Sequence, residues 1–117
     1  MEANRVRIEP NHRRLRVLVD GVVIAETIDS IYLFETGHRP VYYFPKNDIR
    51  FDLLEHTDHS THCPYKGDAS YYTITVGDRS AENAIWSYET PFPAMKEIEG
   101  HLAFYPNRVD AIEVTPA

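Results

Sequence analysis

Residues 55–72 hold the side chains of this chain best suited to chemistry. They include Cys63, the only cysteine, and His56, His59 and His62, three of the six histidines. A thiolate is both a nucleophile and a metal ligand, and imidazole and carboxylate groups are the other ligands that divalent transition metals prefer. Two chemistries are therefore open for this segment: reaction at the cysteine and metal binding.

The spacing of the histidines argues against a metal site. His56, His59 and His62 recur every third residue, which makes them converge only on a helical or 3₁₀ turn. The intervening threonines and serine and the following Pro64 favour loop or strand instead. The chain also lacks paired cysteine couples and a His-Glu-x-x-His helix. We expect exposed histidines, no metal site, and no cofactor that the sequence can identify.

A nucleophilic role for Cys63 is the sharper alternative. Lys66 lies three residues further on and could favour the thiolate, while Asp58 and His59 could act as acid or base. The catalytic candidates are therefore Cys63, Lys66, Asp58 and His59. The competing interpretation is that a lone cysteine is a small buried hydrophobic residue. The sequence does not decide between them, so whether the protein is an enzyme stays open.

A β-turn predicted at residues 64–67 suggests a binding site. Proline fixes φ and Gly67 supplies freedom between two strands, which would place Lys66 at the mouth of an aromatic-walled cleft. There a lysine could anchor a carboxylate or phosphate, although most aromatic residues of a small β domain pack in the core. The candidate ligand-binding residues are Tyr43, Glu55, Thr61, Tyr65, Lys66, Tyr71, Trp86 and Tyr88.

Two hairpins are predicted upstream of this segment. Alternating hydrophobic residues over 14–19 lead into Asp20-Gly21, the strongest signal for a two-residue hairpin turn, and 22–25 returns. Residues 30–35 and 41–44 are rich in β-branched and aromatic residues and flank a loop. Both pairs are expected to be antiparallel.

The remaining elements are mostly short strands. We expect a helical turn near 47–54, strands at 71–76, 84–88, 102–105 and 109–114, and a short α-helix at 94–100 between prolines and a glycine. About eight or nine such strands predict a mainly β fold of two antiparallel sheets, packed as a compact sandwich or open barrel with one or two short helices. A parallel nucleotide-binding sheet is excluded because strands and helices do not alternate.

Composition limits the function classes. A chain of 117 residues suits one domain, residues 1–117, with a single core. The net charge of −6 opposes binding to nucleic acids, and no apolar run is long enough for a membrane span. One cysteine and no apolar signal segment lead us to expect a cytoplasmic protein.

Several motifs carry a resemblance to a known family. They are Tyr43-Phe44-Pro45, Leu54 with Asp58, Thr61-His62-Cys63-Pro64-Tyr65-Lys66-Gly67, Ala69-Ser70-Tyr71, Ala84-Ile85-Trp86-Ser87-Tyr88 with Pro91, and Ala103-Phe104-Tyr105-Pro106. With these motifs nearly the whole chain resembles the domain-of-unknown-function 427 proteins. The resemblance implies a compact β architecture of the β-tent type shared with Mss4-like proteins. The zinc that Mss4-like proteins often carry is not expected here, because one cysteine cannot build paired cysteine knuckles. The resemblance also suggests nucleotidyl transfer, but the chain lacks the spaced aspartates that would hold the two magnesium ions of that reaction.

Two functions follow as hypotheses. In the first, the protein binds a small ligand in an aromatic-lined pocket beside the Cys-Pro-Tyr-Lys-Gly turn. An anion is one candidate for this ligand, and catalysis in the pocket stays open. In the second, the turn is structural and the protein is an interaction module or a homodimer assembled through strand edges.

Overall fold

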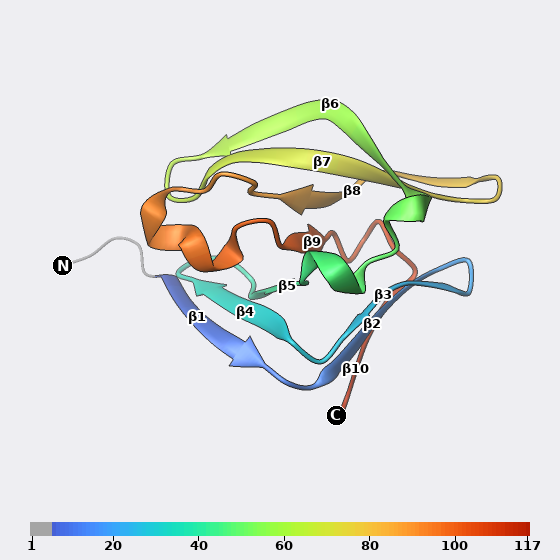
Figure 1. Cartoon of the computed structure of the whole chain (residues 1–117), viewed down its shortest axis with the longest axis horizontal. Helices are drawn as coiled ribbons and strands as arrows, with labels where there is room; N and C mark the ends of the chain where they lie inside the picture. Colours follow the sequence, from blue (N-terminus) through green and yellow to red (C-terminus); the bar gives the residue numbers. More distant parts are fainter. Residues whose placement is uncertain (1–5) are drawn as a thin grey trace.

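The computed structural model describes residues 6–117, which form ten strands and three short 3₁₀ helices (Figure 1). The strands are β1 (Val6–Asn11), β2 (Arg14–Val19), β3 (Val22–Thr27), β4 (Ser30–Glu35), β5 (Val41–Tyr43), β6 (Leu54–Cys63), β7 (Gly67–Val76), β8 (Arg79–Ser87), β9 (Leu102–Phe104) and β10 (Ala111–Thr115). The 3₁₀ helices are η1 (Lys46–Asp48), η2 (Phe51–Leu53) and η3 (Pro93–Ile98). The mainly β class predicted from the sequence is confirmed.

The strands form three antiparallel sheets rather than the two expected. Their orders are β1-β4-β5, β10-β2-β3 and β6-β7-β8-β9. The first two belong to one bent ribbon, because β1 leads into β2 and β3 into β4 across breaks of two residues each (Figure 1). Phe44 and Leu102 exchange two backbone hydrogen bonds, of 2.7 and 2.9 Å, between the end of β5 and β9. The ribbon and the four-stranded sheet thus face each other without closing a barrel.

Both predicted hairpins are confirmed. β2 and β3 pair around Asp20 and Gly21, whose φ values of 51° and 76° are those that the Asp-Gly signal predicts. β4 and β5 pair antiparallel across residues 36–40. The position of the β2–β3 hairpin is therefore set by the conformational preferences of its two turn residues.

The α-helix expected at 94–100 is wrong in type. That segment is the 3₁₀ helix η3, interrupted at Met95, where φ is −110°. So short a segment cannot sustain an α-helix alone, and burial of Met95 and Ile98, three residues apart, suits the 3₁₀ repeat. The helical turn expected near 47–54 is present as η1 and η2.

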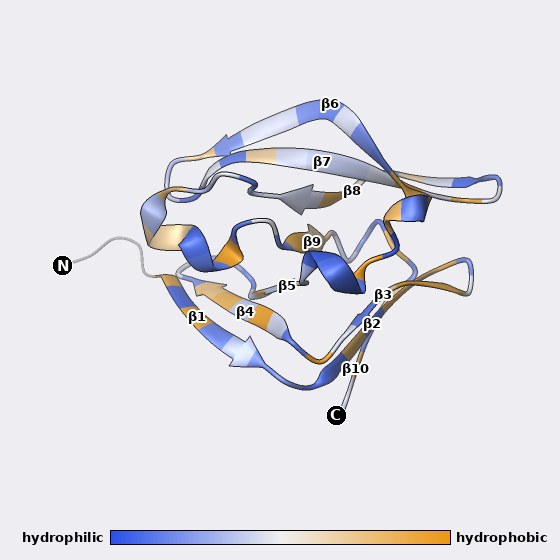
Figure 2. Cartoon of the chain, viewed as in Figure 1, coloured by the Kyte–Doolittle hydropathy of each residue, from blue (hydrophilic) through white to orange (hydrophobic). Residues whose placement is uncertain are grey.

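The core consists of two clusters. The first lies between the β2–β3 part of the bent ribbon and the four-stranded sheet, and in it Leu15, Val17 and Val19 of β2 are fully buried, as their alternation predicts. The second joins β4 and β5 to the four-stranded sheet and contains Leu33 and Tyr43 together with residues of β7, η3 and β9. Figure 2 shows the contrast between hydrophobic β4 and the largely hydrophilic β6, which is an exposed edge strand. No helix in residues 6–117 has the length and apolar character needed to span a membrane.

Candidate functional site

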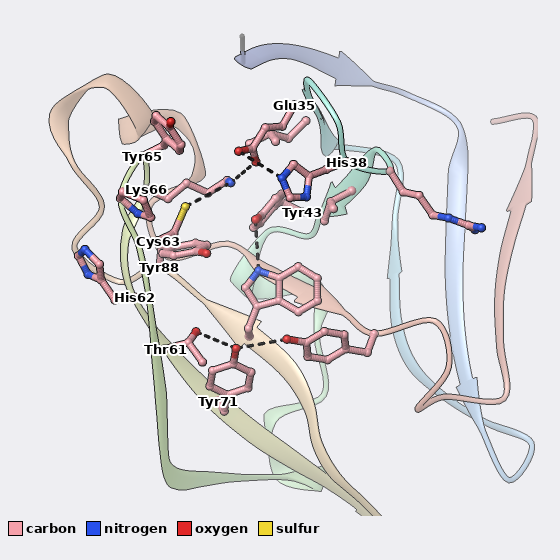
Figure 3. A pocket seen from close by; sticks show the side chains of 16 residues that line it. Glu35, His38, Tyr43, Thr61, His62, Cys63, Tyr65, Lys66, Tyr71 and Tyr88 are labelled. Atoms are coloured by element: carbon pink, nitrogen blue, oxygen red, sulfur yellow. Dashed lines mark hydrogen bonds and ion pairs between the residues drawn. The ribbon is translucent and has the colours of Figure 1, made fainter. Parts of the chain in front are cut away.

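A cavity of about 580 Å³ opens above the second core cluster, between the β4–β5 hairpin and strands β6 to β8 (Figure 3). Seven of the eight residues predicted to bind a ligand line it, together with the catalytic candidate Cys63. The seven are Tyr43, Thr61, Tyr65, Lys66, Tyr71, Trp86 and Tyr88. Trp86 and Tyr88 reach the same cavity because residues two positions apart in an extended chain project to the same face.

The Cys63–Gly67 segment is the turn expected between two strands. Cys63 pairs with Gly67, and the backbone carbonyl of Cys63 accepts a hydrogen bond of 3.2 Å from the backbone nitrogen of Lys66. The carbonyl of Lys66 accepts another, of 2.9 Å, from the backbone nitrogen of Phe92. Gly67 adopts φ 115°, a conformation almost restricted to glycine. The turn is thereby held in a fixed orientation toward β4.

Lys66 is neither solvated nor a free anchor. Its Nζ atom lies 2.5 Å from Oε1 of Glu35, and only 8% of each side chain is exposed. Burial costs both ions their hydration, and their mutual attraction offsets that cost only while both are present. The Lys66–Glu35 pair therefore joins the turn of the four-stranded sheet to the end of β4.

Two further groups surround the ion pair. Lys66 Nζ donates a long hydrogen bond of 3.8 Å to Sγ of Cys63, which is half-buried. On the other side, Nε2 of His38 lies 3.9 Å from Oε2 of Glu35, and the His38 side chain is mostly exposed. One end of the cavity thus combines a cation, a carboxylate, a thiol and an imidazole (Figure 3).

Tyr88 presents an unpaired hydroxyl to this end of the cavity. Only 7% of the residue is exposed, and its hydroxyl makes no hydrogen bond with any residue that the structure describes. Burial raises the pKa of Tyr88 well above its ordinary value, so the group stays protonated. Its hydroxyl is directed toward the interior of the cavity (Figure 3). The hydroxyl is open to the cavity, because Arg16 Nε is the only buried polar side-chain atom without a hydrogen-bond partner among the described residues.

The remaining aromatic walls are fixed by hydrogen bonds. Trp86 donates from Nε1 to the hydroxyl of Tyr43 at 3.2 Å, and the two rings meet edge to face. The hydroxyl of Tyr71 lies 2.9 Å from Oγ1 of Thr61 and 3.2 Å from the hydroxyl of Tyr105. These contacts make the walls a preformed surface rather than a set of mobile rings.

Three candidate residues from β6 lie outside the cavity. Glu55 and Asp58 border a different depression, beside Thr73 and Glu82. His59 is exposed and packs its ring against Tyr71, with 4.4 Å between the ring centroids. An extended strand advances about 3.3 Å per residue, so side chains four to eight positions from Cys63 lie well away from it along the strand. The fold does not bring these three residues to the thiol.

The histidines of β6 are separated in the same way. His56 packs against Tyr72, whereas His62 lies 2.7 Å from Asp68 through Nδ1 and Oδ1. Among residues 6–117, no three histidine, cysteine, aspartate or glutamate side chains gather in a way that could hold a metal ion.

Sequence reasoning missed four polar residues of the cavity, Glu35, His38, Arg39 and Tyr105. Glu35 closes a strand and His38 and Arg39 lie in a loop, and none of these positions carries a local signal of chemistry. Tyr105 did carry one, because it belongs to the Ala103-Phe104-Tyr105-Pro106 motif of the family resemblance.

Comparisons with known proteins agree with that resemblance. A family model described as a domain of unknown function (DUF427) matches residues 7–115, almost the whole chain. A comparison with proteins of curated function finds no match. The motifs around Cys63, Trp86 and Tyr105, which build the cavity, all lie within the matched range. The chain therefore belongs to the DUF427 family.

Proposed function

We propose that the protein binds a small organic molecule in the cavity between the β4–β5 hairpin and the four-stranded sheet. The observation that carries the proposal is the hydroxyl of Tyr88, which opens into the cavity from an otherwise buried residue and has no hydrogen-bond partner in residues 6–117. A ligand that accepts a hydrogen bond would satisfy it. The volume of about 580 Å³ and the aromatic walls are typical of small-molecule sites.

The ligand we propose is uncharged, or carries charges of both signs. Glu35 compensates the charge of Lys66 at 2.5 Å, so the polar end of the cavity has no net charge from this pair. An anion would have to compete with a carboxylate already in place. A neutral molecule could still use the remaining donors of the lysine and the free lone pairs of the carboxylate.

The geometry supports binding better than bond formation at Cys63. The ammonium group nearest to the thiol is already paired with Glu35, and Asp58 and His59 lie elsewhere. We therefore assign Cys63 to the lining of the site and propose no reaction. A single cysteine cannot form a disulfide within the chain, which supports a reducing compartment such as the cytoplasm as the location that we propose.

Trp86 makes the proposal directly testable. It is the only tryptophan of the chain and lines the cavity, so the intrinsic tryptophan fluorescence reports on molecules bound against this one side chain. Phenol, benzyl alcohol and benzamide serve as uncharged probes, and benzoate serves as the anionic probe. We expect the uncharged probes to change the Trp86 emission and benzoate to bind more weakly.

The variant Tyr88→Phe separates binding from folding. Because the hydroxyl has no partner in the described residues, we expect unchanged stability but about fivefold to thirtyfold weaker binding, the loss of one hydrogen bond. Tyr72→Phe is the matched control, since the Tyr72 hydroxyl contacts Glu89 outside the cavity. Equal binding by wild type and Tyr88→Phe would overturn the proposal. A stable dimer in light scattering, combined with no change of Trp86 emission by any probe, would favour the assembly module instead.

A further inference from the structure

A second cavity adjoins the first. Its volume is about 540 Å³, and it lies along β5, β9 and the outer strand β10. The two cavities share three lining residues, Arg39, Val41 and Trp86. The two cavities are therefore neighbours that meet at these three residues.

The lining of the second cavity is almost wholly apolar. Beyond the shared residues it consists of Pro40, Tyr42, Phe44, Phe104, Pro106, Ile112 and Val114. Arg39, at the boundary, is its only charged residue among those the structure describes. Val114 is one of the few large hydrophobic residues left exposed, at 37%. This surface offers a ligand apolar burial and few hydrogen-bonding groups.

The polar groups, by contrast, are concentrated in the first cavity. Lys66, Glu35, Cys63 and Tyr88 all lie there, and none of them contacts the second cavity. The two neighbouring cavities therefore differ in chemistry as the two ends of an amphipathic molecule do. The polar groups lie on one side of Trp86 and the apolar surface lies on the other.

We infer that the two cavities bind one amphipathic molecule, with a polar head beside Tyr88 and the Lys66–Glu35 pair and a hydrocarbon tail along β5 and β10. The inference rests on the proposed function, since it assigns the head group to the same cavity. It adds the class of ligand: a polar head carrying an alkyl or similar apolar chain. The tail would cover Val114 and Ile112, which otherwise remain partly exposed to water.

A chain-length series tests the tail. In 4-alkylphenols from methyl to hexyl the head is constant, and each buried methylene should lower the Kd about threefold to fourfold. We expect this slope in the titration of Trp86 fluorescence, with a plateau once the second cavity is filled. A Kd independent of chain length would overturn the inference.

Two variants locate the tail. Val114→Asp places a charge in the second cavity at an exposed position, so it should flatten the slope without unfolding the protein. Ile28→Asp is the matched control, because Ile28 is 43% exposed and lies outside both cavities. A slope that persists unchanged in Val114→Asp would place the tail elsewhere and contradict the inference.

The outcomes separate the inference from the proposed function. If phenol binding depends on Tyr88 but chain length has no effect, the inference fails and the proposed function stands. If the slope is intact in Tyr88→Phe and every Kd is unchanged, the head-group site fails, and the inference fails with it. Flotation with phosphatidylcholine vesicles is expected to be absent. Its presence would contradict a ligand taken up free from water and indicate a membrane-borne amphiphile.

Discussion

Two ionic contacts tie the four-stranded sheet to the bent ribbon, one at each end of β7, and they differ in burial. At the β6–β7 turn, Lys66 pairs with Glu35, and both side chains are only 8% exposed. At the β7–β8 hairpin, Arg79 contacts Asp20 at 3.0 Å and Asp110 at 2.8 Å, and all three side chains are at least one-third exposed.

The comparison shows that similar distances do not imply similar consequences. Lys66 and Glu35 are almost wholly shielded from bulk water, so either ion left alone would be uncompensated. Around Arg79, water and salt can take over the role of the missing partner. We therefore expect the protein to depend strongly on the first contact and weakly on the second.

The largest effect is expected from breaking the buried pair. Lys66→Met should lower the free energy of unfolding by about 3–5 kcal/mol, because Glu35 would remain as a buried, unpaired carboxylate. Urea denaturation measures it. The double variant Glu35→Gln/Lys66→Met removes both charges and should recover most of the loss. A loss for Lys66→Met no larger than that for Arg79→Met would remove the distinction between the two ends.

The next largest loss of stability is expected from replacing the glycine of the β6–β7 turn by alanine, and the glycine of the β7–β8 turn serves as its comparison. Gly67→Ala should cost about 2–3 kcal/mol, since φ 115° is nearly restricted to glycine. Steric overlap is not the cause, because an added Cβ would lie 3.6 Å from its nearest neighbours in residues 90–92. Gly77→Ala, at φ 57° in open space, should cost only about 1 kcal/mol. Equal losses in thermal unfolding would show that φ does not distinguish the turns.

Alkaline pH should weaken the buried end. Burial, followed by the hydrogen bond with Tyr71, raises the pKa of Tyr105 to about 12. Above the ordinary tyrosine value of about 10, the unfolded chain loses this proton while the folded chain keeps it. The contribution of Tyr105 to the free energy of unfolding should therefore be constant below about pH 10 and be lost between about pH 10 and 12. Tyr105→Phe should make the alkaline fall in the free energy of unfolding shallower, and an identical pH profile would contradict the assignment.

The smallest effect is expected at the exposed end. Arg79→Met should change the unfolding midpoint far less than Lys66→Met, and 1 M NaCl should abolish the difference from wild type. Arg79 also holds the pKa of Asp110 below its usual range. That contribution is present above the ordinary aspartate value and is lost as the pH falls through the lowered pKa. An effect of Arg79→Met that is insensitive to both salt and acid would contradict this interpretation.

Local features of the fold could be predicted from the sequence. The Asp20-Gly21 hairpin, the turn that ends at Gly67 and the shared face of Trp86 and Tyr88 follow from φ preferences and the two-residue period of a strand. The type of the 94–100 helix could not be predicted, because the packing of Met95 and Ile98 decided it. The β-tent likeness to Mss4-like proteins stays a prediction.

By itself the sequence determined the mainly β class, the family and most of the residues that line the cavity. These depend on alternation, turn residues and motifs, all of which act over a few positions. Only the tertiary structure decided that Lys66 is neutralised by Glu35, 31 residues away, and that Glu55, Asp58 and His59 lie outside the cavity. Alternation fixes the side of a strand on which a residue lies, but the packing of one sheet against another decides what that side faces.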